Sequence, residues 1–460
     1  MKFKKLACVA ASVLMVGAIA VPMAACGGNG DGLDSDGNVK KITMWCGGSE
    51  WTGQNYVNLD NFIKEYNKVK PDGFEVKLEH KPDLETSFQS VLTSSKLPDM
   101  MIWDRFNTAT NGIKDYLYPV NDLVEADNID TTAFYAPAME EMTYENKIYG
   151  LPIDVDIWGT YVNMKYVKEY DDAHPGATIS QLLTANWTWD DLLTVAKALK
   201  TTSVNTAYSG GDQYEHLFKY YVSTGHGEEY LVPVEGDTTG RKFQTNFDNQ
   251  RTRDILNFFK EVTNAGVSGK QEADSFIGGV CAMMNKPLYH NNQIKTSKVT
   301  DYKFLPQPRQ NSEDGVNGGM VGGYGIAYPS PKGKYHNKAW EARHQAAWKF
   351  TKWLCYNKDN MLKWTKDIGS LPALSEALNA DECVAGNQVL ADARTYATAK
   401  KTDGSFVYTI RPQVPNYLTL QTDVVNAYVR LFLEGNDSLE TCISNLKTNG
   451  NTKLLFGLGS

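Results

Sequence analysis

Two carboxylates and an aromatic side chain alternate along one short stretch, at Asp154, Asp156 and Trp158. In an extended chain, alternate side chains point to the same face, so these three groups are expected to share one surface. Two carboxylates about 5–9 Å apart can hydrolyse a glycosidic bond when one of them stays protonated. An alternating strand can also leave both acids in water. The tryptophan beside them favours a surface that contacts a ligand.

A second group of such residues follows the apolar segment at 41–45. Trp45 ends that segment, two glycines then let the backbone approach a ligand, and Glu50 and Trp51 come next. In open α/β folds, ligands bind beyond the carboxyl ends of strands. For Trp45 a core position is as consistent as ligand contact, whereas ligand contact is favoured for Glu50 and Trp51.

The motifs of common catalytic sites are absent from the sequence. It contains no G-x-S-x-G elbow and no phosphate-binding loop, and its seven histidines are scattered without an H-x-x-x-H pair. We therefore expect a binding protein without a metal or cofactor. A glycan-degrading enzyme that uses Asp154 and Asp156 remains the alternative.

Charge and cysteine content narrow the class further. The 460 residues carry a formal charge of −8, and removing residues 1–25 takes away three lysines and no acid, which gives −11. This acidity argues against a nucleic-acid partner. Five widely spaced cysteines remain beyond residue 26, without a C-x-x-C motif, so we expect buried thiols, with one disulfide as the alternative. They are Cys46, Cys281, Cys355, Cys383 and Cys442.

The N-terminus has the zones of an export signal. A basic start with three lysines precedes an apolar stretch at 6–20, which is too short for a permanent transmembrane helix. Small residues at 24 and 25 then precede Cys26, whose thiol can accept a diacylglyceryl group. This pattern resembles the bacterial lipobox and predicts a lipid anchor on Cys26. An ordinary signal peptide cleaved after Ala25 is the alternative.

Beyond a Gly- and Asp-rich spacer at 27–38, regular elements begin. Segments 41–45, 74–78 and 98–103 are predicted strands, and 56–68 and 84–94 are predicted helices. This alternation predicts an α/β fold with a parallel, doubly wound start.

Later segments predict a strand at 159–163, a helix from the N-cap Thr188 to about 200, and helices at 251–264 and 340–356. The C-terminal third is mostly helical. Four tryptophans there are expected in the core: Trp340, Trp348, Trp353 and Trp364.

Nine segments in order resemble the extracellular solute-binding proteins of ABC importers that take up sugars. They are ITMW at 42–45, LPDMMIWDRF at 97–106, YGLPIDVDIWGTYVN at 149–163, NWTWDDLLTVAKAL at 186–199, FIGGVCAMMNKPLY at 276–289, GGYGIA at 322–327, AAWKFTKWL at 346–354, GSLPA at 369–373 and RPQVPNYLTL at 411–420. The resemblance implies a two-lobed, class II type periplasmic-binding-protein fold. A ligand would bind between the lobes, which close on it.

The resemblance also implies site residues. Trp103, Asp104 and Arg105 resemble a loop that holds sugar hydroxyls, although the spacing from tryptophan to aspartate is shortened and a surface ion pair is the alternative. Glu85 and Asp156 match acidic, hydroxyl-binding positions, and for Glu85 a solvated helix start explains the acid equally well.

In the second lobe, Tyr214 and Tyr289 lie where relatives carry stacking aromatics, and Tyr324 follows two glycines. Arg411 is expected either to point into the cleft or to brace the hinge. Aromatic faces with planar hydrogen-bonding groups suit an oligosaccharide.

The expected units follow the same resemblance. They are 1–25 signal peptide, 26–39 flexible tether, 40–155 first part of lobe 1, 156–320 lobe 2, 321–375 hinge crossing with elements shared between the lobes, and 376–460 a C-terminal helical part that completes the lobes.

We therefore expect a monomer anchored at the outer face of the cell membrane, with a Gram-positive envelope favoured, that delivers an oligosaccharide to an ABC permease. A polyamine or peptide receptor of the same fold is a further alternative. Arg105 and the polar, Trp-rich loops favour a neutral hydroxylated ligand over a cation.

Overall fold

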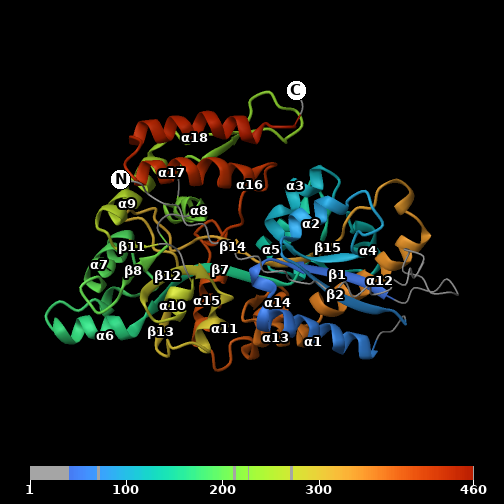
Figure 1. The fold of residues 1–460 in the computed structure, drawn as a ribbon, viewed down its shortest axis with the longest axis horizontal. Coiled ribbons are helices and arrows are strands. Elements are labelled where there is room, and N and C mark those ends of the chain that lie inside the picture. The colour runs from blue at the N-terminus through green and yellow to red at the C-terminus, as the bar shows by residue number, and fades with distance from the viewer. Residues whose placement is uncertain (1–40, 70–72, 211–213, 226, 270–272, 459–460) are drawn as a thin grey trace, which may run out of the picture.

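The computed structural model describes residues 41–69, 73–210, 214–225, 227–269 and 273–458, without the side chains of 214–216 and 273–274. Two main sheets lie side by side, each with its own helices, and one long strand, β7 (Asp154–Asn163), runs between them (Figure 1). We call the first sheet with its helices lobe 1 and the second lobe 2. The predicted signal, the lipid site at Cys26 and the tether lie outside the described residues.

The sheet of lobe 1 has the strand order β2-β1-β3-β15-β6. Its strands are β1 (Lys41–Gly47), β2 (Glu75–Lys81), β3 (Met100–Asp104), β6 (Gly150–Pro152) and β15 (Tyr324–Ala327). β1 is parallel to β2 and β3, whereas β15 is antiparallel to β3 and β6. Helices α1 (Gly53–Val69) and α2 (Leu84–Val91) connect the first three strands, which confirms the predicted parallel start.

The sheet of lobe 2 has the strand order β11-β8-β12-β7-β13. Besides β7, its strands are β8 (Thr206–Ser209), β11 (Ser268–Gly269), β12 (Cys281–Pro287) and β13 (Tyr302–Leu305). β7 begins earlier than the strand predicted at 159–163, because two short strands pair with its first residues. These are β14 (Val321–Gly322) and β16 (Leu371–Pro372).

The chain crosses between the lobes at three places. The first crossing is the start of β7, and the second is the step from β14 into β15. The third is the segment 409–411, where the amide of Val321 donates to the carbonyl of Thr409 and the amide of Thr409 donates to that of Gly319. The predicted boundaries at 155 and 320 lie beside the first two crossings.

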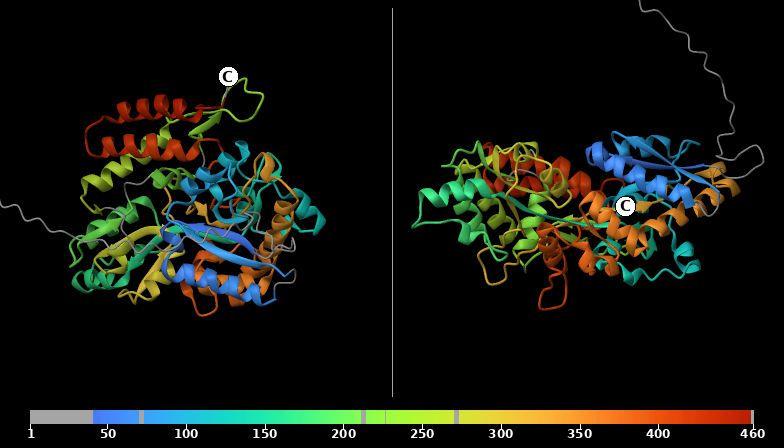
Figure 2. Two further views of the ribbon diagram at one scale, coloured as in Figure 1. Left: turned by 45° about the vertical axis from the view of Figure 1, so that its right-hand side comes forward. Right: turned by 90° about the horizontal axis from the view of Figure 1, so that it is seen from below.

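Helices cover both sheets. Those of lobe 1 are α3 (Thr108–Ile113), α4 (Asn121–Ala126), α5 (Ala136–Glu141), α12 (Lys338–Cys355), α13 (Lys358–Ile368) and α14 (Ser375–Leu378), and α15 (Gln388–Thr398) packs against β7, β13 and β16. Those of lobe 2 are α6 (Met164–Ala173), α7 (Trp189–Leu199), α8 (Tyr214–Ser223), α9 (Gln250–Asn264), α10 (Ala273–Ile277) and α11 (His290–Lys295). The C-terminal helices α16 (Tyr417–Thr419), α17 (Asn426–Leu433) and α18 (Leu439–Leu454) belong to lobe 2, where α17 and α18 contact α9 (Figure 2).

The predicted start of α7 is confirmed. The amide of Asp191 donates to the Thr188 hydroxyl over 3.2 Å, and the Asp191 carboxylate accepts from the Thr188 amide over 2.9 Å. This reciprocal capping box pairs two backbone N–H groups that a helix start otherwise leaves open.

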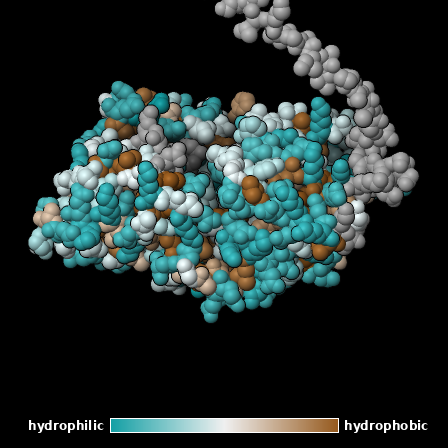
Figure 3. Space-filling model, turned by 60° about the horizontal axis from the view of Figure 1, so that its bottom comes forward, coloured by the Kyte–Doolittle hydropathy of each residue, from teal (hydrophilic) through white to brown (hydrophobic). Residues whose placement is uncertain are grey.

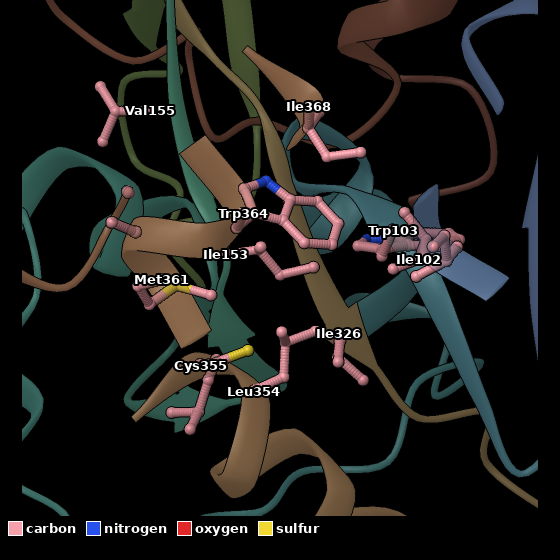
Figure 4. Packing of buried hydrophobic residues seen from close by; sticks show 14 of the residues in the cluster. Ile102, Trp103, Ile153, Val155, Ile326, Leu354, Cys355, Met361, Trp364 and Ile368 are labelled. Carbon is pink, nitrogen blue, oxygen red and sulfur yellow. The ribbon is translucent and has the colours of Figure 1, made fainter. Parts of the chain in front are cut away.

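Two hydrophobic clusters form the core. The first contains Trp364 of α13, Ile326 of β15 and Leu354 of α12, with Ile153, which lies between β6 and β7, among them (Figure 4). Trp340, Trp348 and Trp364 are buried and Trp353 is half-buried, which confirms their expected core role. The five cysteines are buried and free: Cys46, Cys281, Cys355, Cys383 and Cys442.

On the face shown in Figure 3, hydrophobic residues are dispersed among hydrophilic ones. Every helix within the described ranges is too short or too polar to span a bilayer.

His344 of α12 predicts an acid-sensitive term in stability. It stacks on Trp340 with ring centroids 4.7 Å apart, and burial lowers the pKa of His344 to about 4. Below about pH 6.5 the His344 imidazole takes up a proton in the unfolded state but not in the folded state. The free energy of unfolding is therefore not reduced by this group above that pH, and it falls as the pH drops toward 4. As the pH falls between those values, the free energy of unfolding of His344→Phe should therefore rise relative to that of the natural protein by about 1.4 kcal/mol per pH unit. Urea unfolding across this range measures it, and a pH-independent difference would contradict it.

Candidate ligand-binding cleft

A cleft with about 900 Å³ of empty space lies between the lobes. Lobe 1, lobe 2 and the crossings all contribute to its wall. The lining residues are Glu50, Asp104, Phe106, Asp156, Trp158, Phe218, Pro287, Tyr289, Met320, Gly322, Gly323, Tyr324, Arg411, Tyr417, Leu418 and Gln421. Seven residues predicted from the sequence are among them: Glu50, Asp104, Asp156, Trp158, Tyr289, Tyr324 and Arg411.

Three of the predicted aromatic residues meet here although they are far apart in the chain. Trp158 belongs to β7, Tyr289 follows β12, and Tyr324 begins β15. Trp51 does not line the cleft, since it is 2% exposed, but it packs behind Tyr324 in an edge-on contact with centroids 5.2 Å apart. The expectation of direct contact for Trp51 is thus corrected to a supporting position.

Asp156 supplies a buried carboxyl group to the cleft wall. Its Oδ1 accepts a hydrogen bond from the amide of Tyr289 over 3.1 Å. Burial raises the pKa of Asp156 well above its usual value, and the neighbouring Asp154 raises it further. The raised pKa favours the protonated form, and a protonated carboxyl group can both donate to and accept from a ligand hydroxyl.

Arg411 both lines the cleft and braces the hinge, which were the two alternatives for it. Its Nη2 donates to Asp104 over 3.1 Å, its Nε lies 3.4 Å from Glu141, and its guanidinium stacks over Phe106 at 4.1 Å. The cation–π contact and the ion pairs hold the guanidinium plane at the wall of the cleft.

Arg105 and Asp154 were expected in the cleft, and the structure corrects both. Arg105 is completely buried and Asp154 is 2% exposed. Both Asp154 carboxylate oxygens are engaged, one by the amide of Tyr324 over 2.7 Å and the other by the Ser370 hydroxyl over 2.9 Å. Asp154 therefore faces the hinge rather than sharing the cleft with Asp156, and the predicted pair of carboxylates does not form.

Trp45 and Trp103 are core residues, 5% and 1% exposed. The Trp45 indole donates to Glu79 over 3.2 Å, and Trp103 meets the edge of Phe88. For Trp45 the core alternative is confirmed, whereas the ligand contact expected for Trp103 is wrong, because both rings pack in the core of lobe 1.

Glu85 lies at the start of α2, where its carboxylate accepts hydrogen bonds from Asn111 and Gln89. It is not part of the cleft wall. The helix-start alternative gives its place, but Glu85 is half-buried rather than solvated, and burial raises the pKa of its carboxyl group. Tyr214 begins α8, but its side chain lies outside the described residues.

Several cleft residues were missed by the sequence analysis: Phe106, Phe218, Tyr417, Leu418 and Gln421. Gln421 lies in a π-helical turn, Leu420–Val425, and is 3% exposed. Within the described ranges, neither polar atom of its amide has a hydrogen-bond partner. π-Helical turns are rare in proteins, and those that occur are often found at functional sites. Their sequences carry no signal that would have revealed this one.

A buried lysine lies against the cleft tryptophan. The Lys219 ammonium is completely buried, 3.8 Å from the centroid of the Trp158 ring, and donates to Asn285 over 2.7 Å. A cation over one face of an aromatic ring makes the ring a poorer partner for a second cation. Among the described residues, no group of three or more His, Cys, Asp or Glu is placed to hold a metal ion.

Comparison with known proteins places these features in context. Residues 61–391 match the family model of the bacterial extracellular solute-binding proteins. A maltotriose-binding protein of Pyrococcus abyssi is 25% identical over 332 residues, which cover 70% of this chain and 65% of that protein. A lactose-binding protein of Rhizobium radiobacter is 25% identical over 35% of this chain and 36% of its own length. The chain thus aligns with less than two thirds of either relative.

Solved structures share the fold. The cyclic alpha-maltosyl-1,6-maltose binding protein of Arthrobacter globiformis has a TM-score of 0.70 at 17% identity, covering 90% of this chain and 98% of its own. The maltotriose binding protein of Thermus thermophilus has a TM-score of 0.66 at 17% identity, covering 91% and 100%. These matches confirm the predicted two-lobed α/β fold.

Proposed function

The chain belongs to the bacterial extracellular solute-binding protein family, and on that premise we propose that it captures an oligosaccharide between its lobes and delivers it to an ABC transporter permease. Members of this family are exported binding proteins, so the chain is a binding protein and not an enzyme. The observation that carries the sugar assignment is the composition of the cleft wall. Aromatic rings at Trp158, Tyr289 and Tyr324 line it together with the hydrogen-bonding groups of Asp156 and Arg411.

Each kind of group suits one surface of a sugar. Aromatic rings pack against the C–H face of a pyranose, while carboxyl and guanidinium groups bond its hydroxyls. The sugars in the names of the maltotriose- and lactose-binding relatives support the same ligand class.

The alternatives fit less well. A polyamine would place a second cation on Trp158, opposite the Lys219 ammonium, and would face the Arg411 guanidinium. A glycan-degrading enzyme would need Asp154 beside Asp156 in the cleft, but Asp154 is committed to Tyr324 and Ser370.

A thermal-shift panel of maltotriose, lactose, longer oligosaccharides and spermidine tests the function. A ligand at 100 times its Kd adds about 2.7 kcal/mol of stability, which corresponds to a shift of several degrees. We expect such a shift with an oligosaccharide and no release of reducing sugar. A shift with spermidine alone, or steady hydrolysis, would refute the proposal.

Gln421 gives a more local prediction. Replacing it with methionine removes an amide that is buried without partners in the described residues, so the ligand-free protein should gain up to about 1 kcal/mol. A hydroxyl can donate to and accept from this amide, so the same change should weaken oligosaccharide binding about tenfold. Unfolding and binding titrations of the one variant measure both effects, and a loss of stability without a loss of affinity would contradict the assignment.

The anchor on Cys26 is part of the proposal. A tether beside the permease raises the local concentration of loaded protein. Cys26→Ser should release the protein into the medium, because the thiol that accepts the lipid is gone, and the released protein should still bind its ligand. Fractionation of cells that express each form measures this, and a variant that stays in the membrane fraction would contradict the anchor.

A further inference from the structure

One buried acid, Glu141 at the end of α5, lies between two arginines that are far apart in the chain, Arg105 and Arg411. Its Oε2 is 3.3 Å from Nε of Arg105, and its Oε1 is 3.4 Å from Nε of Arg411. The side chains of Glu141 and Arg105 are completely buried, whereas Arg411 is 11% exposed at the cleft. Glu141 itself therefore cannot touch a ligand.

Arg105 ties the first two crossings to lobe 1. Its Nη1 donates to the carbonyls of Asp154 over 2.7 Å and Tyr324 over 2.9 Å, and its Nη2 donates to the carbonyl of Gly322 over 2.6 Å. Gly323 makes this approach possible, because at its φ of +124° a Cβ would lie 2.7 Å from Nη1 of Arg105. One guanidinium thus holds both β7 and the step from β14 to β15.

Arg411 ends the third crossing and is held more loosely. Its contacts with Glu141, at 3.4 and 3.5 Å, are longer than the 2.7–2.9 Å that is usual for a charge-assisted hydrogen bond. Its remaining bonded partner is Asp104, a cleft residue whose side chain is 39% exposed. The position of the guanidinium therefore depends on a balance between a buried acid and an acid at the cleft.

We infer that Glu141 is a positioning residue that holds the three crossings on lobe 1 and sets Arg411 at its place in the cleft wall. The part that concerns the ligand rests on the proposed function. Without the Glu141 charge, Arg411 keeps Asp104 as its partner and moves toward the cleft opening, and Arg105 loses one of its two buried acid partners and keeps only Asp154, at 3.6 Å. Ligand affinity and the order of the hinge then change together.

A matched pair of variants separates this role from general destabilisation. Glu141→Gln removes the charge, and Asp99→Asn removes the charge of another buried acid of lobe 1, which pairs with Arg343 at 2.8 Å and accepts from the amide of Thr43, away from the cleft. In the ligand-free protein, amide exchange at Val321, Tyr324 and Thr409 should rise at least tenfold in Glu141→Gln relative to Asp99→Asn. Equal exchange in the two variants would overturn the inference.

Titration with the oligosaccharide that raises the melting temperature of the natural protein tests the part of the inference that concerns the ligand. Affinity should fall at least tenfold in Glu141→Gln and less than twofold in Asp99→Asn. In an Arg411→Lys background, adding Glu141→Gln should lower affinity by a smaller factor than it does in the natural protein, since lysine cannot bridge both acids and only the contact with Arg105 is then lost. If Glu141→Gln bound the oligosaccharide as tightly as the natural protein, the inference would be overturned. If Glu141→Gln does not fold, the same result in Arg411→Lys would overturn it. A natural protein that binds no oligosaccharide would refute the proposed function, and the exchange result would still decide the hinge role.

Discussion

Arg105→Met is expected to lower the free energy of unfolding by about 3–5 kcal/mol, the cost of removing one partner from a buried ionic network. Glu141 and Asp154 would lose the guanidinium that lowers the pKa of both carboxyl groups, so that burial would raise the pKa of each further. Three backbone carbonyls would also lose a donor. Because total stabilities are about 5–15 kcal/mol, the variant should be only marginally folded at 37 °C.

The matched control is Arg241→Met. Arg241 forms a bidentate pair with Glu145 at 2.6 and 2.7 Å, but its side chain is 44% exposed. Exposed ion pairs contribute at most about 1 kcal/mol. Chemical unfolding of both variants measures the difference. If Arg105→Met were as stable as Arg241→Met, Arg105 would not stabilise the crossings in the way proposed above, and the original expectation that Arg105 contacts the ligand would be favoured again.

Trp158→Ala is expected to weaken oligosaccharide binding by about 2–4 kcal/mol, or roughly 30- to 1000-fold. Trp158 lies in the cleft on a strand shared by the two lobes, where a rigid aromatic ring presents a large apolar area to a sugar. Its loss removes that area and leaves Lys219 without the ring beneath which it lies.

Trp353→Ala serves as the control for this second change. Trp353 is a half-buried tryptophan of α12 that packs on Tyr66 and Phe350 and is absent from the cleft wall. The Trp353→Ala variant should be less stable than the natural protein, while its affinity for the oligosaccharide should stay within about twofold of the natural value. Calorimetric titration of both variants measures the effect, and equal affinity losses would show that Trp158 acts only through folding.

Much of the fold was predictable from the sequence because local patterns are strong there. Clean alternation and short apolar runs predicted β1, β2 and β3, and the capping residues Thr188 and Asp191 predicted the start of α7. The alternation at 154–158 indicated an extended stretch, but its union with the strand predicted at 159–163 was not predictable. Residues 154–157 pair with β14 and β16, which lie far along the chain, so nothing local shows that β7 is one strand.

The site was predictable only in part, for a related reason. Asp104 and Arg105 are neighbours at the end of β3, and sequence alone does not say which of them turns inward. The deciding fact is Glu141, which receives Arg105 in the interior and leaves Asp104 at the cleft. Likewise, Phe218 and Gln421 reach the cleft only because α8 and the C-terminal π-helical turn are brought there by tertiary packing.

The cleft's preference for a neutral hydroxylated ligand is the central claim, and calorimetric titration with oligosaccharides and with spermidine tests it most directly. We predict a saturable isotherm of one oligosaccharide per chain, with a negative heat-capacity change from burial of apolar surface on the aromatic rings. Spermidine should give no heat of binding, because the buried Lys219 ammonium already occupies one face of the Trp158 ring and Arg411 places a cation at the wall. Saturable binding of spermidine together with no response to any oligosaccharide would contradict the claim.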